Sequence, residues 1–422
     1  MRFPSLSKAA LATVGALLAV AAGLLGGGCQ RGSLTGNSRP ADAVDGRAEP
    51  DAVTVSAPRG VHIALLYSSN LQGEFESCDC PTQPLGGLAR RAALVERARA
   101  EADGVLVVDA GDLLLPATSR DREPAPPVAR PRPPDGTDVE RRARLLLDVY
   151  ARLGVAALLP ADGDLGIGLP ALRRLLKGSG VPAIASNLDD ASGAPLFDRD
   201  RIVTVAGVPV GIFGVVQPTG ELQSRWQRWG IRVTDPTAAA RAEISSLKHR
   251  GARMIVALLH LGDAKASRAL LEAAPGITWA VQGHAGMQFE SPETIGGARL
   301  VEAMSQGRLA GRLDIHVVDG TAAFTDRSER AQVLAILADH RQQLADLEQR
   351  AVADQTDQLR QYYPMRRQGL LKAIARDVAL AHQLPTALSG SWYENRIIPL
   401  DPSIPDHAET ARLVRQYKAQ PR

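Results

Sequence analysis

Three side chains that bind transition metals well follow three apolar segments that are far apart in the chain. Asp112 ends the segment GVLVVDAGD, His260 ends MIVALLH, and His284 comes shortly after ITWAVQ. Each segment has the length and composition of a buried strand. In a layered α/β fold, ligands and metals bind at the edge where strands end. Each of the three side chains is competent to bind a metal, so the pattern predicts a ligand or metal site at this edge.

The elements that must position these residues alternate between strand and helix from Val61 to Val318. This alternation, which ends in a strand-rich stretch, predicts a layered α-β-β-α sandwich of two mixed sheets. Within it we expect a strand over 181–187 and an antiparallel hairpin that turns at Ala206-Gly207. The Pro/Arg-rich segment 116–137 is expected to be a loop insertion, because proline interrupts helices and central strands.

Beyond residue 327 the pattern changes to two long amphipathic helices. We expect the first to break near Tyr362-Tyr363-Pro364 and the second to cover 366–384, because proline ends or kinks a helix. We interpret them as a helical hairpin that packs on the main domain or on a protein partner, followed by an irregular tail. The predicted organisation is therefore a signal at 1–29, a flexible tether at 30–59, a main domain at 60–327, and the hairpin with its tail at 328–422.

The N-terminus has the pattern of an export signal. Arg2 and Lys8 accompany an apolar run over 9–25, and small residues then lead to Cys29. The segment resembles a bacterial lipoprotein signal. This resemblance implies that Cys29 is acylated and that lipid anchors the protein in the cell envelope, in the outer membrane and facing the periplasm. The alternative is an uncleaved N-terminal membrane anchor, because the apolar run is just long enough to span a bilayer.

Composition and charge exclude one class of partner. Hydrophobic residues make up 45% of the 422 residues and charged residues 23%, values that are ordinary for a folded domain, and the formal net charge is +3. The sequence holds no basic stripe interleaved with aromatic residues. We therefore expect no nucleic-acid partner.

The order of the three motifs resembles a known family. A GD at Asp112, a lone His at 260 and a GH at His284 are similar to the motifs of the calcineurin-like metallophosphoesterases, in particular their 5'-nucleotidase branch. The resemblance covers about 61–318 and implies two metal ions that share a carboxylate. For one ion it implies Asp112 as the shared ligand, His260 as the lone His, and His284 as the first His of the family's GHxH.

The resemblance leaves the fourth ligand of this ion open between two residues. The family's GNHE aligns on 161–164, so that Asp162 stands where the family has a ligating Asn. A shift of one or two residues would make Asp164 the ligand instead. Asn187 resembles a family position close to the site, which implies a contact with a bound ligand.

The ligands of the other ion depart from the family. Asn70 and Gln72 stand where the resemblance implies an Asp and a His ligand, and Gly286 stands for the last His of GHxH. Gly163 stands for the His that lies beside the phosphate. Neutral amides bind transition metals weakly, so an intact second ion site is not expected.

Two cysteines lie in the loop that follows Asn70. The thiolates of Cys78 and Cys80 are able to replace the lost ligands and would favour a soft metal. The alternative is a disulfide that pins the loop, which an oxidising compartment favours.

Two functional hypotheses follow from the resemblance and its departures. The first is an exported, membrane-tethered hydrolase of small-molecule phosphate esters with one divalent transition metal (Zn, Mn or Fe) at Asp112, Asp162, His260 and His284. The second is a catalytically silent family member, a lipoprotein that binds a ligand, or binds a protein partner through its C-terminal helices. No feature of the sequence assigns nucleotide specificity.

Overall fold

The computed structural model describes residues 60–78, 84–115, 136–218, 220–284, 291–303, 306–318, 323–353, 357–384 and 390–420. All of them belong to the compact unit Val55–Arg422. Several predicted features lie outside the described residues: the signal with Cys29, the tether at 30–59, Cys80, residues 116–135 of the loop insertion, and Gly286.

The first sheet contains the strand that leads to Asp112. Its members are β1 (Val61–Ser68), β2 (Gly104–Asp109), β3 (Val155–Leu158), β12 (Leu309–Val317), β13 (Phe324–Asp326) and β14 (Ser391–Pro399), in the order β13-β14-β12-β1-β2-β3. β1, β2 and β3 run parallel, whereas β12 is antiparallel to both β1 and β14. Parallel pairing of β1 with β2, with Leu65 opposite Leu106, brings the loops after both strands to one edge of the sheet.

The second sheet contains the strands that lead to both histidines. Its members are β5 (Asp200–Val205), β6 (Val208–Val216), β8 (Met254–His260), β9 (Trp279–Gln282), β10 (Glu293–Ile295) and β11 (Ala298–Val301), in the order β10-β11-β9-β8-β6-β5. β6, β8, β9 and β11 are parallel neighbours, so His260 and the residues after β9 lie at the same edge. β5 and β6 form the predicted antiparallel hairpin with its turn at Ala206-Gly207, which confirms that expectation.

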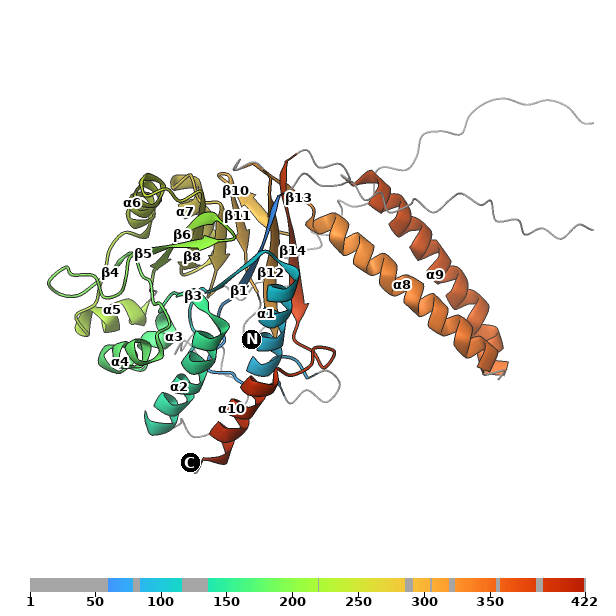
Figure 1. Ribbon diagram of the computed structural model, residues 1–422, viewed down its shortest axis with the longest axis horizontal. Coiled ribbons are helices and arrows are strands. Elements are labelled where there is room, and N and C mark those ends of the chain that lie inside the picture. The colour runs from blue at the N-terminus through green and yellow to red at the C-terminus, as the bar shows by residue number, and fades with distance from the viewer. Residues whose placement is uncertain are drawn as a thin grey trace, which may run out of the picture. The chain divides into compact units, whose positions relative to one another are not determined.

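Apolar side chains fill the space between the sheets and beneath the helices. One buried cluster joins Leu65 and Leu106 of the first sheet to Val210 and Val256 of the second. α1 (Leu88–Glu101) and α2 (Gly136–Leu153) pack along the first sheet, and α10 (Ala408–Ala419) packs against these two helices. α6 (Pro236–His249) and α7 (Ala264–Ala273) pack along the second sheet (Figure 1). The predicted α-β-β-α sandwich of two mixed sheets is confirmed. None of the helices, over the part of the chain that the structure describes, is both long and apolar enough to cross a bilayer.

The connections differ from the prediction at two places. Residues 181–187 are not a strand, because only Ala183 and Ile184 form isolated bridges and Pro182 has no N–H to donate. The short strands β4 (Leu188–Asp189) and β7 (Arg232–Val233) pair with each other instead. The remaining connections hold three helices: α3 (Asp162–Leu165), α4 (Leu169–Ser179) and α5 (Glu221–Arg228). Neither α3 nor α5 is expected from the sequence.

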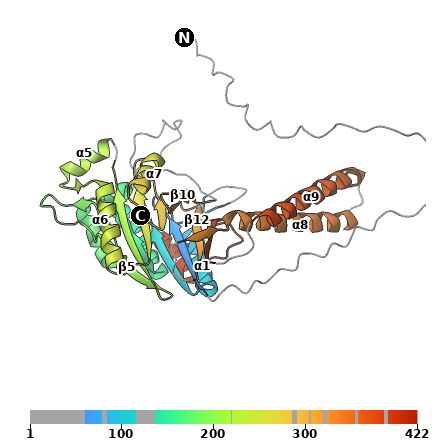
Figure 2. The same ribbon diagram turned by 90° about the horizontal axis from the view of Figure 1, so that it is seen from above.

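The two long C-terminal helices form the expected hairpin. α8 (Ser328–Ala353) and α9 (Asp357–Gln383) lie side by side (Figure 2). The break predicted near Tyr362-Tyr363-Pro364 is wrong, because Pro364 lies inside α9. Proline removes only one backbone donor from the helix. Contacts with α8, such as the 2.8 Å pair between His340 Nδ1 and Asp377 Oδ2, support the rest of α9.

The tail after the hairpin is not irregular. β14 lies between β13 and β12 of the first sheet, with Tyr393 buried against Trp279 at 4.9 Å between ring centroids. Arg396 of β14 pairs with Asp314 of β12, so the charged residues that obscured this strand are matched across the sheet. α10 then packs against α1 and α2. Residues 390–420 are therefore part of the layered fold.

Candidate metal centre

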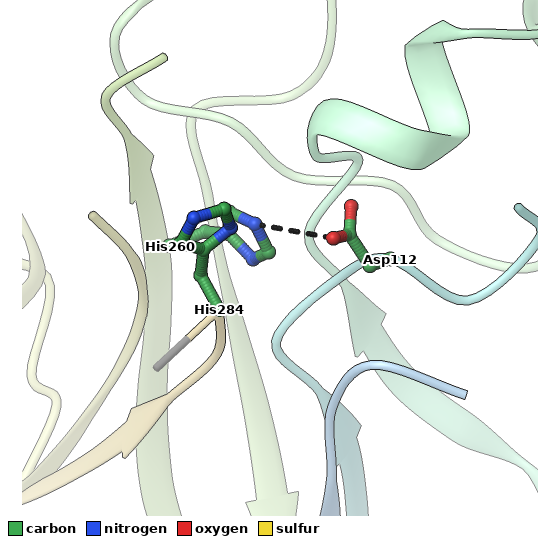
Figure 3. Close-up of side chains that lie close together, drawn as sticks. All are labelled: Asp112, His260 and His284. Atoms are coloured by element: carbon green, nitrogen blue, oxygen red, sulfur yellow. Dashed lines mark ion pairs between the residues drawn. The ribbon is translucent and has the colours of Figure 1, made fainter. Parts of the chain in front are cut away.

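Asp112, His260 and His284 come together where three strands of two sheets end. Asp112 follows β2, His260 is the last residue of β8, and His284 follows β9. One ligand atom from each lies within 4.8 Å of the other two. Figure 3 shows the two imidazole rings on one side and the Asp112 carboxylate opposite, with His260 Nε2 3.6 Å from Asp112 Oδ2. The structure thus brings together three residues that the sequence motifs select.

The loops at this edge hold most of the unusual backbone conformations in the described chain. Six described non-glycine residues have positive φ; Asn70 (54°), Gln72 (58°), Asp112 (54°) and His284 (72°) are among them. Gln306, another of the six, donates its backbone N–H to the Asn70 carbonyl at 2.7 Å. Such conformations cost about 1–3 kcal/mol each and cluster at functional sites. The concentration of strain at one edge supports a functional role for it.

Two glycines allow the loops to approach His260 closely. A Cβ on Gly111 would lie 2.5 Å from Ala161 Cβ, and one on Gly283 would lie 2.5 Å from the Ala110 oxygen and 2.8 Å from His260 Nδ1. Real Cβ atoms do not make contacts this short. The glycines that precede Asp112 and His284 are therefore required by the packing around the His260 ring.

The His260 ring directs one nitrogen at a carbonyl and the other at the centre. Nδ1 lies 2.9 Å from the Ala110 oxygen, and because a carbonyl can only accept, Nδ1 carries the hydrogen. The lone pair of the neutral ring is then on Nε2, which is buried and has no hydrogen-bond partner. Buried polar atoms are normally partnered, so this orphaned nitrogen fits a bound metal ion.

Asp162 and Asp164, the two candidates for the fourth ligand, have different surroundings. Asp164 accepts backbone N–H bonds from Asp112 (3.0 Å), Leu114 (2.8 Å) and Ala161 (3.1 Å), so both of its oxygens are in use. The buried Oδ1 of Asp162 has no hydrogen-bond partner. Its Oδ2 lies 3.8 Å from His284 Nδ1. The arrangement favours Asp162 as the ligand and gives Asp164 a structural role.

The pKa values at this edge reflect several buried carboxyl groups that lie close together. Burial raises the pKa of Asp162 to about 6, opposed by His260 and assisted by Asp112. Burial and then Asp112 raise the pKa of Asp164 to about 8. Burial tends to lower the pKa of His260, but Asp112 and Asp162 raise it above its usual value. Burial and then His260 lower the pKa of His284, which keeps that imidazole neutral and able to ligate. A cation at the centre would offset the repulsion among the carboxylates.

The positions that depart from the family have backbone or structural contacts. Asn70 accepts the His284 N–H at its side-chain Oδ1 (3.0 Å), and Gln72 donates its backbone N–H to the Asp112 carbonyl (2.7 Å). Gly163 donates its N–H to Asp112 Oδ1 at 2.6 Å. Cys78 is half-buried and bonded to Leu85, through its N–H at 2.8 Å and its Sγ at 3.3 Å. A second ion site rebuilt with Cys80 stays a prediction, because Cys80 and Gly286 are outside the described residues.

Asn187 lies buried next to the end of β6. Its Nδ2 donates to the carbonyls of Val216 (2.8 Å) and Thr234 (3.0 Å), and its Oδ1 accepts the Val216 N–H at 2.9 Å. These bonds link two chain segments beside the metal centre. The predicted contact of Asn187 with a ligand stays a prediction.

Sequence reasoning missed Asp109, which precedes Asp112 by three residues. Its fully buried carboxylate accepts bonds from Ser68 Oγ (2.6 Å), Tyr150 OH (2.9 Å) and the Gly111 N–H (2.9 Å). Burial raises the pKa of Asp109. The network ties the end of β1 and the helix α2 to the loop that presents Asp112. The signal in the sequence is a carboxylate inside an apolar strand, which needs partners in the fold.

Two curated phosphoesterases are similar to parts of this chain. No protein-family model matches the chain. It is 27% identical over 268 residues to the 2',3'-cyclic-nucleotide 2'-phosphodiesterase/3'-nucleotidase of Yersinia enterocolitica, a match that covers 57% of this chain and 38% of the relative. It is 24% identical over 316 residues to the trifunctional nucleotide phosphoesterase protein YfkN of Bacillus subtilis, covering 66% of this chain and 21% of that protein. The chain thus spans well under half of the length of either curated relative.

Solved structures share the fold. The calcineurin-like phosphoesterase YfkN from Bacillus subtilis superposes with a TM-score of 0.56 at 18% identity, covering 85% of this chain and 97% of that one. The 5'-nucleotidase precursor from Thermus thermophilus superposes with a TM-score of 0.55 at 18% identity, covering 84% of this chain and 58% of that one. This chain therefore shares the fold of these phosphoesterases, and its strand-end Asp112–His260–His284 group makes it similar to the calcineurin-like metallophosphoesterases and their 5'-nucleotidase branch.

Proposed function

We propose that this protein is a metal-dependent hydrolase of phosphate esters that works with one divalent metal ion. The observation that carries the proposal is the buried Nε2 of His260, which has no hydrogen-bond partner and lies in the group formed with Asp112 and His284. The names of the curated relatives, both phosphoesterases, support hydrolysis of phosphate esters as the reaction.

Each residue of the centre has a role that follows from its contacts. Asp112, His260 and His284 would hold the ion, with Asp162 as the fourth ligand. The ion supplies Lewis-acid chemistry, because it polarises a phosphoryl oxygen and makes water more acidic. The Gly163 N–H satisfies Asp112 Oδ1, which leaves Oδ2 on the side of His260.

Exposure indicates where a substrate reaches the centre. The His284 side chain is 25% exposed, whereas those of Asp112 and His260 are 1% exposed and that of Asp162 is 3% exposed. We therefore propose that the ester approaches from the side of His284. Because Gly163 offers no side chain to protonate a leaving group, esters with a good leaving group such as p-nitrophenol should react fastest. A 2',3'-cyclic nucleotide, named for the Yersinia relative, is the first natural substrate class to test.

Metal content tests the proposal most directly. The full chain, purified in detergent without chelators and reconstituted with zinc or manganese, is expected to hold one ion per chain by elemental analysis. His260→Ala and His284→Ala should each lose it, and His382→Ala, an exposed histidine of α9, is the matched control. Equal metal content in all four proteins would refute the assignment of the centre.

Activity is the second measurement. Turnover of bis-p-nitrophenyl phosphate and of 2',3'-cyclic AMP should require the added metal and should fall at least a hundredfold in His260→Ala. If the wild-type protein binds metal but hydrolyses neither ester, a catalytically silent protein becomes the better interpretation.

One observation favours that second candidate, a lipoprotein that binds a protein partner. Seven large hydrophobic side chains are exposed in the described chain, and six of them lie on the hairpin: Leu334, Ile336, Tyr362, Met365, Leu371 and Leu380. Concentrated exposed apolar surface is typical of interaction sites. Photo-crosslinking from position 336 in cells, compared with position 229 at the exposed Trp outside the hairpin, is expected to capture a partner only from the hairpin.

We also propose that the protein is tethered in the bacterial envelope by acylation of Cys29, with the main domain on the periplasmic side. The support is the basic start, the apolar run and the small residues before Cys29.

A further inference from the structure

Asn70 joins four parts of the metal centre through buried hydrogen bonds. Its backbone N–H donates to the Gly111 carbonyl at 2.7 Å, and its own carbonyl accepts the Gln306 N–H at 2.7 Å. Its side-chain Oδ1 accepts the backbone N–H of His284 at 3.0 Å. The residue is 2% exposed, so solvent does not compete for these bonds. Asn70 thereby connects the ends of β1, β2 and β9 to the turn before β12.

His284 depends on its hydrogen bond to Asn70 because, unlike His260, it has few other contacts that fix its position. The His260 ring is fully buried and its Nδ1 is fixed by the Ala110 carbonyl. His284 has a left-handed backbone (φ 72°), its side chain is a quarter exposed, and its Nδ1 comes no closer than 3.8 Å to Asp162. Among the described residues, the bond that the His284 N–H donates to Asn70 Oδ1 is the one hydrogen bond of the His284 backbone.

The chemistry of an amide suits this place in a centre with one ion. Three buried aspartates already lie at this centre. Asp164 Oδ2 accepts the Asp112 N–H at 3.0 Å, and Asp162 Oδ2 lies 3.8 Å from His284 Nδ1. A fourth buried carboxylate would add charge that one divalent ion does not balance. The neutral Asn70 side chain provides the acceptor that the His284 N–H needs without adding a charge.

We propose that Asn70 is a positioning residue, whose side-chain oxygen holds His284 in its left-handed conformation and so presents the imidazole to a single metal ion. The inference rests on the proposed metal function. It assigns a positioning role to Asn70, which stands where the family resemblance implies an Asp ligand.

The test compares two substitutions of Asn70 in the full chain. Asn70→Leu has a similar volume and no acceptor, whereas Asn70→Asp retains the acceptor. Gln72→Leu, two residues away and bonded in the centre through its backbone, is the matched control. The measurements are the hydrogen-exchange rate of the His284 amide and the zinc dissociation constant from competition with a chromophoric chelator.

We expect Asn70→Leu to speed exchange at His284 and to weaken zinc binding, each at least tenfold, while Asn70→Asp keeps the amide protected. Values for Asn70→Leu within twofold of those for Gln72→Leu would overturn the inference. If Asn70→Leu does not fold by circular dichroism, the smaller Asn70→Ala is read by the same two measurements. If the wild-type protein binds no zinc, the proposed function fails, and the exchange rate at His284 still decides whether Asn70 holds that residue.

Discussion

Replacement of Asp164 by alanine should destabilise the protein and weaken its metal binding together. The carboxylate accepts three backbone N–H bonds, from Asp112, Leu114 and Ala161, at 2.8–3.1 Å in a fully buried place. Each buried donor left without a partner costs about 1–3 kcal/mol, which gives about 3–9 kcal/mol for the three. Removal of a buried carboxyl group also relieves its own desolvation, so we expect the lower end, about 3 kcal/mol.

The assay is urea unfolding of the full chain, followed by tryptophan fluorescence and paired with zinc affinity. Asp164→Asn should lower the free energy of unfolding by less, about 1–2 kcal/mol, because the one amide oxygen still accepts two of the three hydrogen bonds. Asp148→Ala, at an exposed position of α2, is the control. A loss in Asp164→Ala below about 1 kcal/mol, or zinc affinity equal to that of the control, would refute the structural role that we give to Asp164.

Three further predictions concern pH, packing and anchoring. Folding raises the pKa of Asp162 to about 6, so above the ordinary Asp pKa this group binds more protons in the folded metal-free protein than in the unfolded chain. Its contribution to the free energy of unfolding should therefore fall by on the order of 2–3 kcal/mol as pH rises from about 4 to above 6. Zinc should suppress this fall in thermal unfolding scans. Gly283→Ala should destabilise the protein by about 1–3 kcal/mol and reduce its metal content, because the new Cβ would collide with the Ala110 oxygen and the His260 ring. A free energy of unfolding in urea and a metal content equal to those of the wild-type protein would contradict this. Cys29→Ser should release the protein from the membrane fraction in immunoblots of fractionated cells, and retention with an unprocessed N-terminus would support the alternative anchor.

The sequence predicts the metal centre better than it predicts its supports. Asp112, His260 and His284 are recognisable because each follows an apolar strand, and parallel strands bring their ends to one edge. The contacts that hold these residues are not local. Asn70 bonds His284 from 214 positions away, and Asp164 bonds the loop of Asp112 from 52 positions away. No periodicity or spacing indicates such partners.

The C-terminal region likewise shows that local sequence patterns do not predict elements that depend on tertiary contacts. β14 contains Glu394, Asn395 and Arg396, which a local reading assigns to an irregular tail. In the structure Arg396 meets Asp314 of β12 and the buried Asn395 accepts the Tyr67 hydroxyl at 2.9 Å, so tertiary partners override local propensity. Pro364 shows the reverse case, in which a strong local signal for a helix end is overridden by packing along α8.

The place of β14 has a consequence for when the proposed metal centre is completed during folding. β14 pairs with β12, and β12 pairs with β1, so the first sheet lacks an internal strand until residues 391–399 have been made. Asn70 and Asp112 follow β1 and β2 of that sheet, so we expect their loops to reach the observed positions once the sheet has formed. A chain that crosses the inner membrane unfolded would therefore capture its ion after translocation rather than during synthesis. Metal availability, more than affinity, decides which divalent ion fills such a site in cells. The ion in this centre should then reflect the metal supply of the compartment in which the chain folds, and expression in the cytoplasm should load a different metal from expression with export.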